Sequence, residues 1–340
     1  MKTVIRQSVG IDISKDDFEA RICGIDTEME LSFNGSLKFE NNKKGFKRFV
    51  KWVINRTKSE IPLHFIMEAT GIYYESLAYY LHKNSYNTHV LLPNMSKHFF
   101  NSLNAKSKTD KSDAKNLGIL GVERKFDNWS PPSPFFKKLR SLTRYNDQLK
   151  EQKTVFSNML HSYELSEDVD RFVVNDTRKI IAVFEKKIAK SFEKIQAHIK
   201  SDSDVAQKIS NICTTKGLGL LTAAIIIAET YGFELFHNQK QLTSYAGYDI
   251  VERQSGSSIK GKTRISKKGN SRIRKAMFLP TMSHIRCNEA AKTRYNRIVD
   301  KKGIRMIGQV AAQRKLLILI YTLWKNNEPF DEKKASRTLR

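Results

Sequence analysis

Four acidic residues in three separated motifs of this 340-residue chain could hold metal ions beside a phosphate group. Asp12 lies in VGIDISK, Glu68 in FIMEATGIYYESL, and Asp110 and Asp113 in KTDKSDAKNLG. Carboxylate oxygens are the donors that Mg²⁺ prefers, and clustered acids let divalent cations polarise a phosphodiester. Ser255, in QSGSSIKG, adds an alcohol that can carry a cut DNA end covalently. The pattern predicts phosphodiester cleavage with Mg²⁺, or with Mn²⁺ in its place.

Each acidic motif also has an ordinary structural interpretation. Asp12 could close a turn and Glu68 could cap the next helix. Asp110 could be a helix N-cap, with Asp113 favouring the helix dipole. For any single motif the two interpretations are equally good. The three motifs together, in a strongly basic chain, favour the metal site, because close carboxylates repel unless cations neutralise them.

The elements that must position these acids lie in residues 1–128, where strand-like and helix-like patterns alternate. We predict strands at 9–13, 18–25, 30–39, 63–67 and 88–92, and helices at 46–53, 73–81 and 110–122. Three strands followed by alternating helices and strands is the order of a ribonuclease-H-like α/β fold. Glu68 directly follows the fourth strand, at the carboxyl end where ligands of open α/β sheets bind.

Beyond residue 128 the pattern becomes helical. Residues 129–204 begin with the linker WSPPSP and continue as two amphipathic helices joined near 167–176, which predicts a coiled-coil helical hairpin. This hairpin could pair subunits or simply be an ordinary helical domain. Residues 205–340 form a mostly helical C-terminal region that includes helices at 272–300 and 305–325. The predicted fold class is therefore α/β followed by α.

The charge of the chain points to nucleic acid. Lys and Arg number 60 against 35 Asp and Glu, a net charge of +25, which favours a polyanionic partner. The turn TKGLG resembles a helix-hairpin-helix turn, although a plain glycine turn fits equally well. The segment after Val251 is dense in basic residues, as a solvated charge run also would be. The candidate nucleic-acid-binding residues are Lys216, Gly217, Gly219, Arg253, Gly256, Lys260, Lys262, Arg264, Lys267, Lys268 and Arg272.

Cysteine usage and hydropathy bear on the compartment. The three cysteines are far apart and have no metal-ligand spacing, which argues for a reducing cytosol and against a zinc site. The first residues contain no apolar stretch of signal-peptide length, and no apolar run is long enough to span a membrane. We expect a soluble cytoplasmic protein without a membrane partner.

Several motifs resemble the DEDD transposases of the insertion-sequence 110 and 1111 type, which include the Piv-like DNA invertases. The resemblance runs through nearly the whole chain, over GIDISK, MEATGIYYESL, LPNMSKHF, KTDKSDAKNLG, TKGLGLLTA, QSG, ISKKGNSRIRKAM and AAQRKLLILIYTLWK. In combination, the motifs KTDxxDA and SGxxxxG…KxGNxxxR are specific for this family. One departure is AGYDI at 246–250, where the family usually has Ala-Gly-Leu-x-Pro.

The resemblance implies an N-terminal RuvC-like nuclease domain in which the four acids bind Mg²⁺. It implies a C-terminal transposase domain in which Ser255 is the nucleophile, preferred over Ser257, Ser258 and Ser266 because it directly precedes a glycine. It further implies a structured bridge RNA as guide, double-stranded donor and target DNA as substrates, and a homodimer that assembles into a homotetramer. Cleavage would pass through a phosphoserine intermediate, in a prokaryotic cytoplasm near the nucleoid.

Other functions stay open at this point. A site-specific DNA invertase of the same family would have the same construction. A metal-only RuvC-like nuclease or junction resolvase would use water as the nucleophile and leave Ser255 without a role. A non-catalytic nucleic-acid-binding protein could keep the fold.

Overall fold

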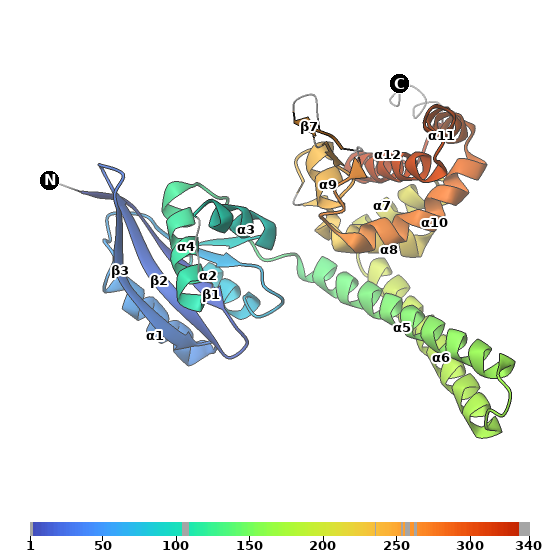
Figure 1. Ribbon diagram of the computed structural model, residues 1–340, viewed down its shortest axis with the longest axis horizontal. Coiled ribbons are helices and arrows are strands. Elements are labelled where there is room, and N and C mark those ends of the chain that lie inside the picture. The colour runs from blue at the N-terminus through green and yellow to red at the C-terminus, as the bar shows by residue number, and fades with distance from the viewer. Residues whose placement is uncertain are drawn as a thin grey trace. The chain divides into compact units, whose positions relative to one another are not determined.

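The structure is a computed structural model that describes residues 3–103, 109–234, 236–252, 254–255, 259–261 and 264–332. The chain forms two compact units, Met1–Pro131 and Pro132–Arg340 (Figure 1). The boundary falls within the WSPPSP segment, and the long helices group with the C-terminal part. A further division at residue 204 stays a prediction. No helix in the described ranges is long and apolar enough to cross a membrane.

The first unit is built on a five-stranded sheet with the order β3-β2-β1-β4-β5. Its strands are β1 Val4–Ile13, β2 Asp17–Asp26, β3 Leu31–Glu40, β4 Leu63–Glu68 and β5 Asn87–Leu91. The first three strands are antiparallel, while β4 runs parallel to both β1 and β5. The five predicted strands are all present, and most are longer than the hydrophobic pattern alone indicated. The mixed α/β composition is confirmed.

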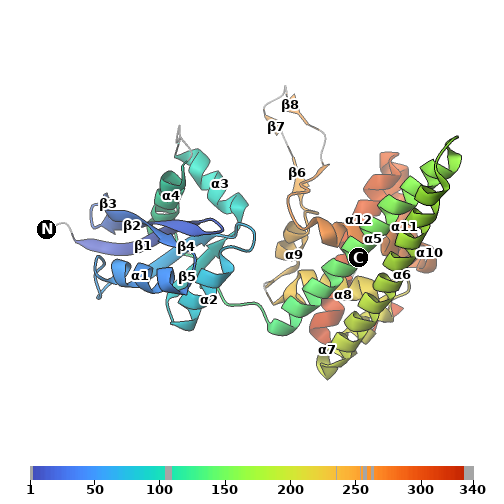
Figure 2. The same cartoon turned by 90° about the horizontal axis from the view of Figure 1, so that it is seen from below.

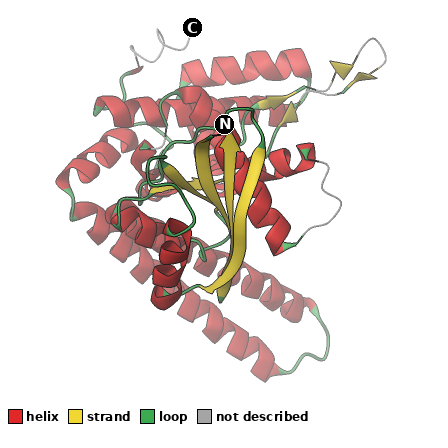
Figure 3. Cartoon of the chain, turned by 90° about the vertical axis from the view of Figure 1, so that its left-hand side faces the viewer, coloured by secondary structure: helices red, strands yellow, loops and turns green. Residues whose placement is uncertain are grey.

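Helices cover both faces of this sheet (Figure 3). On one face α1 Lys43–Ile54 and α2 Glu75–Lys83 pack on the odd-numbered residues of β1, in a core with Phe18, Phe49 and Phe65. On the other face α3 Pro93–Ser102 and α4 Asp110–Glu123 pack around Ile66 and Leu91. Because successive side chains of a strand point to opposite faces, the even-numbered residues of β1 face α4.

Helix α3 was not predicted from the sequence. Pro93 directly follows the strand predicted at 88–92, and it also begins α3, where it occupies one of the first helical positions. Proline is favoured there because its fixed φ suits the helix and its missing N–H would have no partner in the first turn. The same residue that stops the strand therefore starts the helix.

The second unit begins with the two long helices that the sequence predicted, α5 Pro134–Leu165 and α6 Arg171–Lys200. They run antiparallel, because successive contacts pair Asn146 with Ser191, Lys153 with Glu185, and Glu164 with Arg178. The joint at 166–170 is shorter than the predicted one. A role of this hairpin in pairing subunits stays a prediction.

The remaining helices enclose the core of the second unit. They are α7 Ser203–Cys213, α8 Leu220–Glu229, the short η1 Tyr231–Phe233, α9 Gln239–Tyr245, α10 Ser271–Cys287, α11 Glu289–Lys302 and α12 Arg305–Asn326. The predicted single helix at 272–300 is wrong, since Asn288 is extended and separates α10 from α11. The Asn288 side chain accepts a hydrogen bond from the Ala291 N–H, as an N-cap does.

Between α9 and α10 the chain forms a β-hairpin where the sequence predicted only a basic loop (Figure 2). At its base β6 Ile250–Val251 pairs with β9 Arg264–Ile265. Farther along, β7 Gln254–Ser255 pairs with β8 Ile259–Lys260. We call these four strands the arm. The sequence analysis did not predict these strands, because each has only two residues and the segment is rich in charged residues.

Candidate active site

The packing of β1 on α4 fixes the level of Asp12. The Ser8 hydroxyl donates to the Gly118 carbonyl at 2.6 Å, and a Cβ on Gly10 would collide with the backbone of Ala114 and Gly118. Ser8 contacts Gly118, whereas Gly10 also lies against Ala114, so β1 runs toward the start of α4 in the direction from Ser8 to Gly10. Two strand residues span about 6.6 Å and four helix residues about 6 Å, so Asp12 lies level with the first turn of α4.

That first turn holds both acids of the KTDKSDA motif. Asp110 is the first residue of α4 and is exposed, while Asp113 is half-buried. Glycine at position 10 allows this arrangement, because α4 approaches β1 so closely that no side chain fits between them. The even-numbered face of β1 and the start of α4 thus bring three of the four predicted acids to one edge of the sheet.

Glu68 reaches the same edge from the neighbouring strand. Ile11 of β1 lies opposite Met67 of the parallel strand β4, so Asp12 and Glu68 follow at the next position of the two strands. Ile66 packs with the α4 residues Leu117 and Leu120, and alternation places Glu68 on that same face. The Glu68 carboxylate accepts hydrogen bonds from Ser96 of α3 at 2.5 Å and from Thr70 at 3.3 Å.

Three of the ordinary structural roles considered for these acids do not match the structure, whereas Asp113 does lie in the first turn of α4, where it favours the helix dipole. Asp12 lies within β1 rather than in a turn. Helix α2 begins at Glu75 without a side-chain cap, so Glu68 does not cap it. Thr109, not Asp110, is the N-cap of α4, in a capping box with Ser112.

The structure adds a buried acid that the sequence analysis missed. Glu19 of β2 lies opposite Asp12 in the antiparallel pair, so both side chains are on the α4 face. It is only 5% exposed and accepts a hydrogen bond from the Ser36 hydroxyl at 2.6 Å. The pKa of nearby Lys38 is raised, chiefly by its hydrogen bond to Asp17 and also by the charges of Asp110 and Glu19. The alternation of apolar and charged residues in Phe18-Glu19-Ala20-Arg21 was the sequence pattern that could have indicated this acid.

The donor set fits a magnesium ion, because all four predicted ligands are carboxylates. Within the described ranges, no three His, Cys, Asp or Glu side chains are placed to hold one ion together. Glu68 in particular is held by Ser96 and Thr70. Ion binding therefore requires Glu68 to turn from its present hydrogen-bond partners, while the backbone already places the four acids at one edge.

Ser255 lies in the arm of the second unit. It ends β7 and pairs with Ile259, the first residue of β8. Only the backbones of Ser255 and Lys260 are described. Other residues of the predicted site, namely Arg253, Gly256 and Lys262, and the alternative serines Ser257 and Ser258, lie outside the described residues.

The base of the arm is tied to the helical body. The Ser266 hydroxyl donates to Asp249 at 2.5 Å, and the Lys267 N–H donates to the Gly247 carbonyl. Lys267 has a φ of 54° and Gly247 a φ of 73°, both in the left-handed region that favours glycine. Three of the predicted basic residues, Arg264, Lys267 and Lys268, are exposed here. Because its hydroxyl is held by Asp249, Ser266 has a structural role at this position.

The TKGLG turn joins α7 to α8, as the sequence indicated. Gly217 has a φ of 95°, and a Cβ there would lie 2.6 Å from the His284 backbone nitrogen of α10. His284 also bonds the Lys216 carbonyl through Nδ1 at 2.9 Å, so the turn packs on α10. Gly219 precedes α8 and has nothing within 4 Å of an added Cβ. Phosphate binding by exposed Lys216 and these glycines stays a prediction.

A buried carboxylate links the helices behind the arm. Glu229 of α8 is fully buried and forms a bidentate pair with Arg144 of α5 at 2.7 and 2.9 Å. Asn270, the N-cap of α10, also donates to it at 2.7 Å. Burial acts to raise the pKa of Glu229, but the hydrogen bonds from Arg144 and Asn270 and the charge of Arg140 outweigh it, so the pKa is lowered. The sequence analysis did not predict this network.

We expect Glu229→Gln to destabilise the second unit by about 2 kcal/mol, because the change removes the carboxylate that accepts charge-assisted hydrogen bonds from the partly exposed Arg144. Chemical denaturation followed by circular dichroism measures this loss. Glu234→Gln is the matched control, since Glu234 is exposed just beyond the same helix and should change stability little. Equal effects of the two substitutions would contradict the assigned role of Glu229.

The chain is similar to known transposases and DNA-inverting proteins. Residues 9–163 match a family model described as a transposase of the DEDD, IS110 type, and residues 209–296 match one described as "Transposase IS116/IS110/IS902 family". The chain is 27% identical over 326 residues to the pilin gene-inverting protein of Moraxella bovis, which covers 96% of this chain and 98% of that protein. The pilin gene-inverting protein of Moraxella lacunata matches to the same extent.

More distant similarities are shorter or weaker. An uncharacterised 43.6 kDa protein of insertion element IS110 from Streptomyces coelicolor is 31% identical over 93 residues, 27% of this chain and 23% of that protein. Among solved structures, the Aquifex aeolicus member of the Ppx/GppA family covers 56% of this chain and 90% of its own at 11% identity. Its TM-score of 0.22 is too low to indicate a shared fold.

Proposed function

The chain belongs to the IS110-type DEDD transposases, and we propose that it is an insertion-sequence transposase that joins cut DNA to its own serine. Its relatives are transposases and DNA inverters, so the class is that of recombinases that cleave and rejoin DNA. Members of this family typically use a divalent metal ion. The proposed ligands are Asp12, Glu68, Asp110 and Asp113, and the proposed nucleophile is Ser255.

One observation carries the metal part of this proposal. The pairing of β1 with β4 and the packing of α4 on Gly10 bring acids from three distant motifs to one edge of the sheet. Close carboxylates repel one another, so such a gathering is costly unless cations or other positive charges neutralise it. A bound divalent cation would supply charge stabilisation for the phosphate oxygens. Nucleic acid is the matching substrate, since the chain carries a net charge of +25.

The chemical step assigned to Ser255 is a transesterification. Its hydroxyl oxygen forms a bond to phosphorus, one phosphorus–oxygen ester bond of the DNA breaks, and the released sugar oxygen takes up a proton. The serine proton passes to solvent or to a neighbouring base. The position of Ser255 in the outer strand pair of the arm, beyond the pair formed by β6 and β9, supports this role, because a residue away from the helical body can reach a DNA strand. A DNA hydroxyl from another strand reverses the step and completes strand exchange.

Guidance by a bridge RNA and assembly of homodimers into a tetramer are the finer parts of the proposal. Both are supported by the motif resemblance. The charge of the chain supports binding of a structured RNA as well as DNA, because phosphate recognition by Lys and Arg does not distinguish them. In this assembly the acids of one subunit would meet Ser255 of another.

Site-specific DNA inversion is the second candidate. It is favoured by the similarity to the pilin gene-inverting proteins, which extends over 96% of this chain. The two candidates use the same chemistry and differ in the arrangement of their DNA sites.

The test is a recombination assay with the purified chain, the RNA transcribed beside its coding sequence, and plasmids that carry its flanking DNA ends. We expect new junctions with Mg²⁺ and none with EDTA, and restoration when Mg²⁺ is added back in excess. Junctions between two plasmids indicate transposition, while flipping of a segment between inverted sites indicates inversion. Undiminished recombination in EDTA would contradict the proposed metal chemistry.

A further inference from the structure

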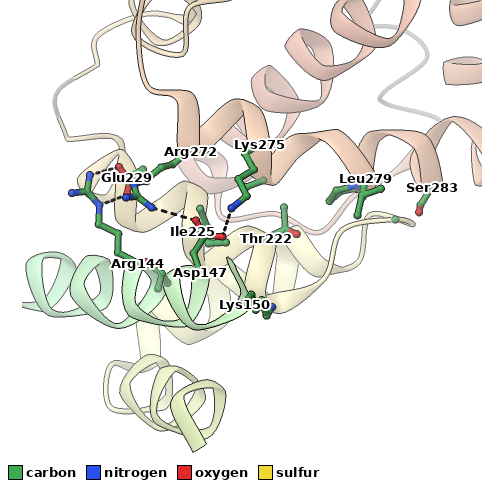
Figure 4. A pocket seen from close by; sticks show the side chains of 14 residues that line it. Arg144, Asp147, Lys150, Thr222, Ile225, Glu229, Arg272, Lys275, Leu279 and Ser283 are labelled. Carbon is green, nitrogen blue, oxygen red and sulfur yellow. Dashed lines mark hydrogen bonds and ion pairs between the residues drawn. The ribbon is translucent and has the colours of Figure 1, made fainter. Parts of the chain in front are cut away.

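A pocket of about 420 Å³ lies between α5, α8 and α10 of the second unit (Figure 4). Arg144, Asp147 and Lys150 reach it from α5, and Arg272 and Lys275 reach it from α10 (Figure 4). Thr143, Gly217, Thr222, Ile225, Glu229, Ala276, Leu279, Pro280 and Ser283 complete the lining. Its size falls in the range of small-ligand pockets, about 300–1,000 Å³.

The lining carries more positive than negative charge. Four cationic side chains face two carboxylates, Asp147 and Glu229. The Glu229 carboxylate accepts hydrogen bonds from Arg144 and Asn270. Asp147 is shared between Arg272 at 3.2 Å and Lys275 at 2.7 Å. Glu151, just outside the lining, also pairs with Lys275 at 2.6 Å, so three carboxylates serve four cations and one positive charge stays in excess, which suits an anion.

Lys150 is the cation least compensated by protein groups. Across the described residues its ammonium makes no hydrogen bond or salt bridge, whereas Arg144, Arg272 and Lys275 each make at least one. Lys150 is exposed overall, but partial desolvation by its neighbours lowers its pKa and the charge of Lys275 lowers it further, although Asp147 acts in the opposite direction. An anion between Lys150 and Lys275 would relieve this repulsion.

The rest of the lining narrows the kind of anion. Thr222 and Ser283 supply hydroxyl groups, which donate hydrogen bonds to phosphate oxygens in many nucleic-acid complexes. Leu279 is 70% exposed and, with Pro280, provides an apolar side. A phosphate joined to a sugar combines a charged group with an apolar face, as this lining does, while an acidic peptide would leave the apolar side without a matching surface.

We propose that this pocket binds a backbone phosphate of a nucleic-acid strand, with Lys150 as its principal contact and the sugar against Leu279. The inference rests on the proposed function only in taking nucleic acid as the partner. The strand can be DNA or RNA, since the pocket recognises the chemistry that both share.

The test measures equilibrium binding of labelled DNA and of RNA of the same sequence to the full-length protein, without divalent metal, over a series of salt concentrations. We expect Lys150→Ala to weaken binding about tenfold for one strand type or both, the effect of losing a charge-assisted contact. The slope of log affinity against log salt should fall by about 1. Lys150→Arg should retain most of the affinity, because the positive charge is kept.

Lys138→Ala is the matched control, because Lys138 is an exposed lysine of the same helix that does not line the pocket. Circular dichroism of each variant confirms that the fold is kept. Loss with DNA alone identifies the substrate strand, and loss with RNA alone identifies the guide. If Lys150→Ala binds both strands like Lys138→Ala, with an unchanged salt slope, the pocket proposal is wrong. A protein that binds with this pattern but never recombines DNA would contradict the proposed function and would still support phosphate binding in the pocket.

Discussion

Replacing Asp110 by asparagine is expected to lower DNA cleavage by about a thousandfold or more while leaving the fold intact. The substitution keeps the size of the side chain but removes the negative charge that would hold a divalent cation. Losing several kcal/mol of charge stabilisation at the phosphate corresponds to about three orders of magnitude in rate. Asp110 is exposed at the start of α4 and is not its N-cap, so the helix does not depend on it. Single-turnover cleavage of end-labelled DNA in Mg²⁺ measures the loss.

The same result is expected for Glu68→Gln, which approaches the edge from β4 instead of from α4. Glu123→Gln is the matched control, because Glu123 is an exposed acid at the other end of α4, about 20 Å from Asp110. The control should cleave at the rate of the unmodified protein. Cleavage that survives both Asp110→Asn and Glu68→Gln would show that this edge of the sheet is not the catalytic centre.

Replacing Ser255 by alanine is expected to abolish the covalent link between protein and DNA. The substitution removes the only atom that could form the phosphoserine bond, so strand exchange should fall below detection while DNA binding is kept. The adduct is measured by denaturing electrophoresis of labelled DNA after quenching. Ser244→Ala serves as the control, because Ser244 is an exposed serine of α9 outside the arm.

The outcome also separates two mechanisms. If Ser255→Ala still cuts DNA at the normal rate and no adduct forms with any variant, water is the nucleophile and the chain is a metal-only nuclease. If an adduct persists in Ser255→Ala, another side chain carries the DNA.

Much of the first unit could be predicted because local pattern and tertiary structure agree there. Apolar alternation around Asp12 and Glu68 located two strands, and the α4 pattern located the helix that carries Asp110. The strand order and the close approach of α4 to Gly10 then explain why these acids share an edge. Residue spacing alone could not give that proximity, because it depends on which strands are neighbours and in what register.

Features that depend on a single residue in its tertiary surroundings were missed. Pro93 signalled the end of a strand but not the beginning of α3, and Asn288 was not recognised as the cap that divides α10 from α11. Glu19 looks like any surface acid until β2 is paired with β1. Glu229 lies in an apolar helix, and its partners Arg144 and Asn270 are distant in the chain, so only the folded unit reveals the network.

The central claim is that the carboxylates of the sheet edge and the serine of the arm act on one phosphodiester. Its most direct test is to form the protein–DNA adduct in Mg²⁺, digest both components, and identify the modified peptide by mass spectrometry. We predict a nucleotide on Ser255 in the unmodified protein and in Glu123→Gln, and no modified peptide in Asp110→Asn. A nucleotide attached to a different residue, or an undiminished yield of the Ser255 adduct from Asp110→Asn, would contradict the account.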